Sequence, residues 1–155
     1  MDGMTANAQP GLDFGILLAI GYQEFVRALR ASMAASGFAD LGRSDGYVLR
    51  ALDGNPLTVS ALAELLDITK QGAAQIVDDM GARGYVERRE STVDRRARPL
   101  YLTERGRRAL AAARRFHRRY ERELARQHGA EVVAGLRSVL TAIAGDSEGR
   151  PQAHV

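Results

Sequence analysis

The sequence predicts a mainly α-helical chain that carries one small β-hairpin. Through most of its 155 residues, apolar side chains recur at spacings of three and four, the pattern of a helix that is buried on one side. Two short segments that read as strands, residues 85–88 and 100–102, interrupt this pattern and flank a polar, basic stretch, as the strands of a hairpin flank its tip. A chain of this length is expected to form one domain, here 1–155.

Composition narrows the chemistry open to such a chain. It has no cysteine, which excludes disulfides, thiolate metal sites and thiol redox sensing. His117, His128 and His154 are too scattered for a zinc site, so we expect no metal and no cofactor. The first basic residue is Arg27, and the short apolar run at 16–20 cannot span a bilayer. We therefore expect a cytoplasmic protein without a membrane partner.

Charge is distributed unevenly along the chain. Residues 1–82 carry 5 basic and 10 acidic side chains, residues 83–126 carry 15 and 6, and residues 127–155 carry 2 and 3. A basic block within an otherwise mildly acidic chain indicates a localised contact with a polyanion. A solvated helix face is the alternative, and charge alone does not decide between them.

Two helices are expected in the first third of the chain. The first runs from Leu12 to 35, where Gly37 closes it, and the second covers 43–52, with Ser44 as its N-cap. The dense turn signal at 53–56 ends the second helix. The small, polar residues 1–11 are expected to be disordered.

The middle of the chain predicts two short helices joined by a tight turn. Thr58 caps a helix that ends at 67–68, and Thr69 caps a second helix that runs to about Arg83. The second helix turns its apolar side inward through Ala73, Ile76, Val77 and Met80. Such a pair is a candidate helix-turn-helix.

The hairpin follows directly, and two more helices complete the chain. Gly84 ends the preceding helix, and Thr103 caps a new one after the second strand. Its expected inward stripe consists of Leu110, Ala113, His117, Tyr120 and Leu124. Gly129 separates it from a last apolar helix that reaches 145, and the polar residues 146–155 are expected to be disordered.

A helix-turn-helix followed by a basic hairpin is a winged helix in outline. The segment Leu57–Leu66 resembles the first helix of the motif in the MarR family of bacterial regulators, and so do the runs 84–89, 94–96 and 102–106 in their order and spacing. The resemblance covers about residues 12–145. It implies a homodimeric winged-helix repressor or activator of transcription that a small, frequently aromatic, ligand releases from DNA.

Position on the second helix of the motif suggests which side chains meet a duplex. A helix N-terminus fits the major groove, where Gln pairs with adenine, Lys with guanine, and Ala touches a thymine methyl group. The candidates are Thr69, Lys70, Gln71, Gly72, Ala74 and Gln75. A close approach of backbone to DNA would explain a glycine at 72, although a neutral surface glycine is the alternative.

The hairpin supplies the second set of candidates. Arg95, Arg96 and Arg98 are placed to enter a minor groove or to contact phosphates, and Arg88 and Arg89 flank the hairpin. The family resemblance implies that Asp94 orients Arg96 through an ion pair. Solvated arginines are the alternative for each position taken alone.

The terminal helices, 12–35 and 104–145, carry more apolar side chains than are needed to pack against a small DNA-reading lobe at 43–103. Pairing them across a two-fold axis would set two reading helices about one DNA turn apart. The resemblance also implies a ligand pocket between lobe and terminal helices, with Tyr22, Arg27, Tyr47, His117 and Tyr120 as candidates. Satisfied core or interface residues are the alternative for these five.

Other classes of function fit less well. The sequence has no Ser-His-Asp set, no phosphate-binding glycine loop and no metal-ligand spacing, which argues against an enzyme. A membrane-surface role for the arginine-rich helix needs large apolar anchors on its opposite face, where Ala113, His117 and Tyr120 stand instead. A winged helix that binds only protein stays open as the alternative to DNA binding.

Overall fold

The computed structural model describes residues 11–94 and 96–146. Its elements in chain order are α1 (Phe14–Ala35), α2 (Asp45–Ala51), α3 (Val59–Leu66), α4 (Lys70–Ala82), β1 (Val86–Arg88), β2 (Leu100–Leu102), α5 (Glu104–His128) and α6 (Ala130–Asp146). The two strands pair antiparallel, with Val86 opposite Leu102. The predicted class, a mainly α-helical winged helix with one hairpin, is confirmed.

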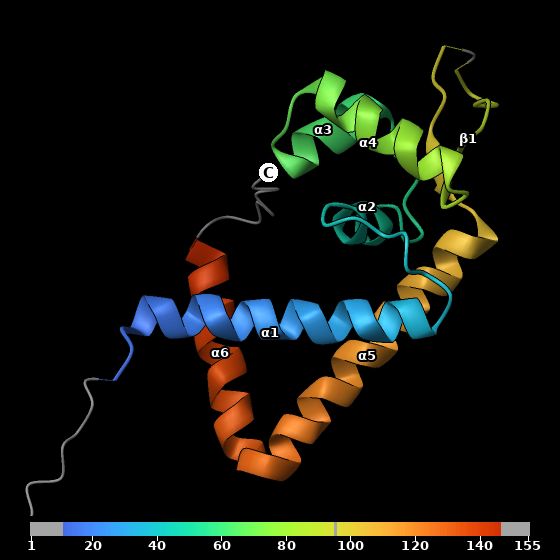
Figure 1. The fold of residues 1–155 in the computed structure, drawn as a ribbon. Coiled ribbons are helices and arrows are strands. Elements are labelled where there is room, and N and C mark those ends of the chain that lie inside the picture. Colours follow the sequence, from blue (N-terminus) through green and yellow to red (C-terminus); the bar gives the residue numbers. More distant parts are fainter. Residues whose placement is uncertain (1–10, 95, 147–155) are drawn as a thin grey trace, which may run out of the picture.

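The elements divide into two ends that α5 connects. The helices α3 and α4 and the hairpin lie at one end, α5 and α6 meet in a V at the other end, and α1 crosses α5 between the two (Figure 1). Along its length α5 packs against β2, α2, α1 and α6. None of the helices in the described part of the chain is long and apolar enough to cross a membrane.

The hydrophobic core lies in the winged-helix end of the molecule. Its largest fully buried side chains are Val48, Leu49, Leu62, Leu66, Met80, Tyr85 and Leu100. In contrast, large apolar side chains stay exposed on the first half of α1 and along α6, including Phe14 at 71% and Val132 at 63%. The single chain therefore leaves two apolar helix faces uncovered.

Local capping explains where three helices begin. The hydroxyl oxygens of Thr58, Thr69 and Thr103 each accept a hydrogen bond from the backbone N–H three residues later, at 3.1, 3.0 and 3.0 Å. These three caps confirm the sequence prediction. Asp67, in the left-handed conformation, ends α3 as expected.

The prediction of Ser44 as an N-cap is wrong. Its backbone is already helical and its side chain makes no capping hydrogen bond, whereas a capping residue needs an extended backbone. Asp45 takes over the local role, because its carboxylate accepts a hydrogen bond from the backbone N–H of Gly42 at 2.7 Å. The same carboxylate also binds Arg83, which fixes the start of α2 from outside.

Element ends and the inward side of α5 differ from the predictions in detail. The first helix begins at Phe14 and not at Leu12. Disorder at 1–11 and 146–155 falls almost wholly outside the described residues, and Asp146 is the last residue of α6. On α5 the fully buried large side chains are Leu110 and Phe116, and Phe116 is absent from the predicted stripe.

Two close contacts join the hairpin to its neighbours. The backbone N–H of Leu100 donates to the carbonyl of Leu57 at 2.7 Å, so the segment before α3 adds a bridge to β2. At the start of α5, a Cβ built on Gly106 would lie 2.2 Å from the carbonyl oxygen of Tyr85. Only a glycine lets α5 approach the hairpin this closely.

Candidate nucleic-acid interface

The outer side of α4 presents the polar side chains that the sequence selected. Lys70, Gln71 and Gln75 are exposed and Ala74 is half-buried, whereas Ala73, Val77 and Met80 on the opposite side are buried. The structure therefore brings these four candidates together on one accessible helix face. This face lies at the end of the molecule that also carries the hairpin (Figure 1).

Gly72 has a local explanation in addition to any contact with DNA. Its N–H donates to the hydroxyl oxygen of Thr69, and a Cβ at position 72 would lie 3.1 Å from that oxygen. A larger residue would press on the atom that caps α4. The glycine thus protects the geometry of the first turn, where the free amides of the helix point outward.

The tip of the hairpin is built as a series of tight turns. Ser91 Oγ accepts hydrogen bonds from the backbone N–H groups of Val93 and Asp94 at 3.2 and 3.1 Å. The N–H of Ala97 donates to the carbonyl of Asp94 at 3.0 Å. These bonds hold the tip in one shape and leave Arg96 and Arg98 exposed. Arg95 lies outside the described residues.

The ion pair expected between Asp94 and Arg96 is not present. Asp94 Oδ1 accepts instead from the backbone N–H of Arg96, at 2.9 Å. An aspartate that accepts a hydrogen bond from the backbone N–H two residues ahead stabilises a turn. The Asp94 carboxylate is thus bonded to the backbone and not to the guanidinium of Arg96. The side chain of Arg96 therefore stays free to leave the protein surface.

The two arginines beside the hairpin are held against the protein. Arg88 pairs with Asp78 of α4 at 2.9 Å. Arg89 donates from Nε to Glu87 at 2.9 Å and stacks over the ring of Tyr101, 4.5 Å from its centroid. Both side chains stay accessible from solvent, so both are held in a fixed orientation while exposed.

Sequence reasoning missed one feature of the hairpin tip. Val93 is 95% exposed, which makes it the most exposed large apolar side chain in the described part of the chain. An apolar residue within the polar stretch 91–98 was the available signal.

Behind the interface lies a polar hub made of Asp40, Asp45, Arg83, Tyr85 and Arg105. Arg83 Nη1 binds Asp45 Oδ2 at 2.6 Å, and its Nε donates to the carbonyl of Asp79 at 3.1 Å, so it also caps the end of α4. The Tyr85 hydroxyl donates to Asp40 Oδ1 and accepts from Arg105 Nη2 at 3.0 Å. The hub ties the end of α4 to α2 and to the start of α5.

The electrostatics of the hub favour these pairings. The hydrogen bond from Tyr85 is the main cause that lowers the pKa of Asp40, and the nearby arginines add to it. Burial, followed by the hydrogen bond to Asp40, raises the pKa of Tyr85 to about 12. The hydrogen bond to Asp45 raises the pKa of Arg83. At neutral pH the Asp40 carboxylate is charged and the Tyr85 phenol is neutral, which suits the hydrogen bond between them.

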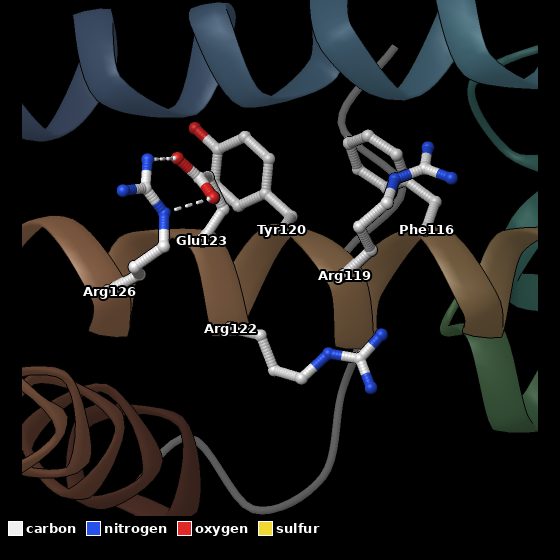
Figure 2. A pocket seen from close by; sticks show the side chains of 6 residues that line it. All are labelled: Phe116, Arg119, Tyr120, Arg122, Glu123 and Arg126. Carbon is white, nitrogen blue, oxygen red and sulfur yellow. Dashed lines mark hydrogen bonds and ion pairs between the residues drawn. The ribbon is translucent and has the colours of Figure 1, made fainter.

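A concavity of about 430 Å³ opens on the far half of α5. It is lined by Phe116, Arg119, Tyr120, Arg122, Glu123 and Arg126 (Figure 2). The Glu123 carboxylate pairs with Arg126 beside the Tyr120 hydroxyl. Hydrogen bonds from Arg126 and then Gln127 lower the pKa of Glu123 to about 2.

The five ligand candidates do not surround one cavity. Tyr120 alone among them lines the concavity. His117 packs 5.2 Å from the ring of Phe25, and burial, with a smaller effect of the Arg50 charge, lowers its pKa. Tyr22 is 64% exposed and Tyr47 is 38% exposed. Arg27 is exposed and pairs with Glu24 on its own helix at 3.3 Å.

Comparison with known proteins agrees with this geometry. The model of the MarR family matches residues 39–97. A curated relative, the HTH-type transcriptional regulator PetP of Rhodobacter capsulatus, is 35% identical over 108 residues. The chain belongs to the MarR family. The aligned stretch is 67% of this MarR-family chain and 63% of PetP, so the chain spans less than two thirds of the length of that relative.

Solved structures share the MarR-type fold over nearly their whole length. CouR, a transcriptional repressor bound to a 23-mer DNA duplex, is 28% identical with a TM-score of 0.67, covering 85% of this chain and 92% of that one. Streptococcus pneumoniae FabT in complex with DNA has a TM-score of 0.70 and 23% identity, covering 88% and 98%. At 23% identity, the similarity to FabT is evidence for the shared fold alone.

Proposed function

We propose that this MarR-family chain regulates transcription as a homodimer that binds a pseudo-palindromic duplex operator, acts as a repressor, and is released by a small aromatic ligand. The observation that carries DNA binding is the exposed polar face of α4 beside a hairpin with free arginines. The name of PetP and the duplex bound to CouR support the same assignment.

Base reading falls to the first two turns of α4. Gln71 and Gln75 each offer the two-pronged amide that matches adenine, and Lys70 suits guanine or a phosphate near the helix N-terminus. Ala74, half-buried between them, suits a thymine methyl group. Each matched pair is worth about 1–3 kcal/mol of discrimination.

The wing adds affinity from the neighbouring groove. Arg96 and Arg98, with Arg95, extend from a tip that internal hydrogen bonds keep in place. A narrow minor groove attracts such arginines through its negative potential. Arg88 and Arg89 contact the backbone from the two sides of the hairpin and position the protein without reading sequence.

A second copy of the chain covers the apolar faces of the terminal helices. The exposed apolar side chains on α1 are Phe14, Ile16, Leu17, Leu18, Ile20 and Tyr22, and on α6 they are Val132, Leu136, Val139, Leu140 and Ile143. So large an apolar surface is typical of an interface. We propose the effector site between the lobe and the terminal helices, near Tyr120, which lines the concavity on α5. Its other candidates are Tyr22, Arg27, Tyr47 and His117.

The test is DNase footprinting on the DNA upstream of the gene, followed by titration of the protected duplex. We expect a protected pseudo-palindrome that fixes the two-fold symmetry. Gln71→Ala combined with Arg96→Ala is expected to weaken binding by roughly 2–6 kcal/mol, about thirty-fold or more. Arg43→Ala with Gln127→Ala, two exposed positions away from α4 and the wing, serves as the matched control.

Unchanged affinity in the Gln71/Arg96 variant would refute the DNA assignment and favour the alternative, a winged helix that binds protein. Sedimentation of the free protein tests the dimer separately, and a monomer at micromolar concentration would contradict it. Release of the duplex by a panel of small aromatic compounds tests the effector; an unchanged affinity across that panel would remove that part of the proposal.

A further inference from the structure

A second basic surface lies on α5. Arg108, Arg115, Arg118 and Arg122 follow one another at spacings of seven, three and four residues, so they line one side of the helix. All four are exposed. Within residues 11–94 and 96–146, none of them forms a hydrogen bond or an ion pair. We call these four side chains the arginine stripe.

Other arginines of α5 are engaged, which sets the stripe apart. Arg114 pairs with Asp53 at 2.7 Å. Arg119 donates to Ser32 Oγ at 3.0 Å, and Arg126 pairs with Glu123. Among the described residues, the protein therefore neutralises or anchors the neighbours of the stripe and gives the four guanidinium groups of the stripe no partner. Like charges so close repel one another, and a polyanion relieves that repulsion.

The stripe runs along α5 away from the reading face, beginning at Arg108, about 6 Å along the helix from the hairpin. It lies on a different side of α5 from the buried Ala109 and Leu110. The side chain of Arg122 points away from α1 (Figure 2). Because a helix rises about 1.5 Å per residue, Arg122 stands about 27 Å along α5 from the hairpin. The reading face on α4 lies beyond the hairpin end of α5 (Figure 1).

The chemistry of the stripe fits a phosphate backbone better than other partners. It contains no large apolar side chain, unlike the exposed faces of α1 and α6, so it does not continue the apolar surface assigned to a second copy. A lipid surface needs apolar anchors that are missing here. From Arg108 to Arg122 the stripe is about 21 Å long. A duplex presents roughly twelve phosphate charges over such a length, because it carries one per about 1.7 Å of axis.

We propose that the arginine stripe binds the phosphate backbone of a second DNA segment, so that one molecule holds two duplexes at once. The contact is independent of base sequence, because exposed arginines on a convex helix reach phosphates and not base edges. The proposal goes beyond operator reading: it concerns a different surface and needs no particular sequence.

The experiment uses the full chain and two DNA molecules. An immobilised duplex containing the footprinted site is saturated with protein, and a labelled duplex of arbitrary sequence is then added. The stripe variant is Arg108→Gln, Arg115→Gln, Arg122→Gln. The matched control is Arg30→Gln, Arg43→Gln, Arg50→Gln, which removes the same charge from exposed positions outside α5. Thermal unfolding checks that both variants fold.

We expect the wild type and the control to recruit the labelled duplex. The stripe variant is expected to keep the footprint and to lose recruitment at least ten-fold. The salt dependence of binding to the arbitrary duplex should fall by up to about 2.7 in slope, because three phosphate contacts are lost. These results would support the stripe as a second DNA surface.

Three results would overturn the proposal: no recruitment by the wild type, equal recruitment by the stripe variant, or equal loss in the control. Failure of operator reading is a separate outcome, because it shows as a missing footprint in the wild type. In that case the arbitrary duplex is immobilised in place of the operator, and the stripe variant is compared with the wild type on the same readouts.

Discussion

Gly106 offers a sharp test of how the hairpin is joined to α5. It is the third residue of the helix, and its N–H donates to the cap at Thr103. A Cβ at this position would lie 2.2 Å from the carbonyl oxygen of Tyr85 and 3.4 Å from Leu102 Cβ. Gly106→Ala therefore forces the backbone of Tyr85 and the start of α5 apart by about 1 Å, because such atoms normally stay about 3.5 Å apart.

The cost follows from what that backbone shift disturbs. The carbonyl of Tyr85 also accepts the N–H of Thr103 at 3.0 Å. Overpacking costs about 1–3 kcal/mol, and a weakened buried hydrogen bond costs about 1 kcal/mol more. The better helix propensity of alanine returns about 1 kcal/mol. The net loss is about 2 kcal/mol, or roughly 4–8 °C in Tm for a chain of this length.

The assay is thermal and urea unfolding followed by circular dichroism. Gly46→Ala is the matched control, because Gly46 lies within α2 and a Cβ there meets nothing within 4 Å. That control is expected to be neutral or to stabilise the protein by up to about 1 kcal/mol. If Gly106→Ala were as stable as Gly46→Ala, the close packing of α5 on the hairpin would be refuted.

Three further predictions concern stability. Because burial lowers the pKa of His117 below 6.5, the unfolded chain binds a proton more readily than the folded chain. The free energy of unfolding is therefore highest above that pH and falls as the pH decreases below it. In urea titrations between about pH 7 and 5, His117→Gln should flatten this pH dependence of stability, whereas His128→Gln should not. A wild type with flat stability would contradict this. Arg83→Met leaves the Asp45 carboxylate buried without its partner and should cost about 2–3 kcal/mol, with partial recovery on adding Asp45→Asn; no recovery in urea unfolding would refute the pairing. Thr103→Ala should lower the urea midpoint by the equivalent of about 1–2 kcal/mol, and an unchanged midpoint would show that the cap contributes nothing.

What the sequence predicts well is what short stretches determine. The caps at Thr58, Thr69 and Thr103 depend on a residue only three positions away. The second strand was predicted at its observed bounds, because Leu100–Leu102 has flanking turn residues and apolar side chains that suit a strand. The exposed side of α4 followed from helical periodicity alone.

What the sequence did not predict depends on partners far apart in the chain. The hub joins Asp45 to Arg83, thirty-eight residues away, and Asp40 to Arg105, sixty-five residues away. No local pattern distinguishes these arginines from solvated ones. Ser44 is an example: its neighbour Asp45 pairs with the distant Arg83, and Ser44 does not form the cap that the local sequence predicts.

The candidate site was predicted unevenly for the same reason. The side chains of α4 and the wing lie close in sequence, and the structure places the described ones on one end of the molecule. The proposed ligand residues come from three helices, and neither periodicity nor composition indicates how α1 crosses α5. The aromatic contact of Phe25 with His117 is a product of that crossing.

The length of α5 means that a small tilt of this helix would move its two ends measurably from their present positions. Its 25 residues form a rod about 37 Å long, anchored to the hairpin at Gly106 and to α6 through the pair Arg137–Glu121. A tilt of the rod by about 5° would displace one end relative to the other by about 3 Å, close to the rise of one base pair. A small change in the packing of the terminal helices would thus displace the reading lobe along the double helix by about the rise of one base pair.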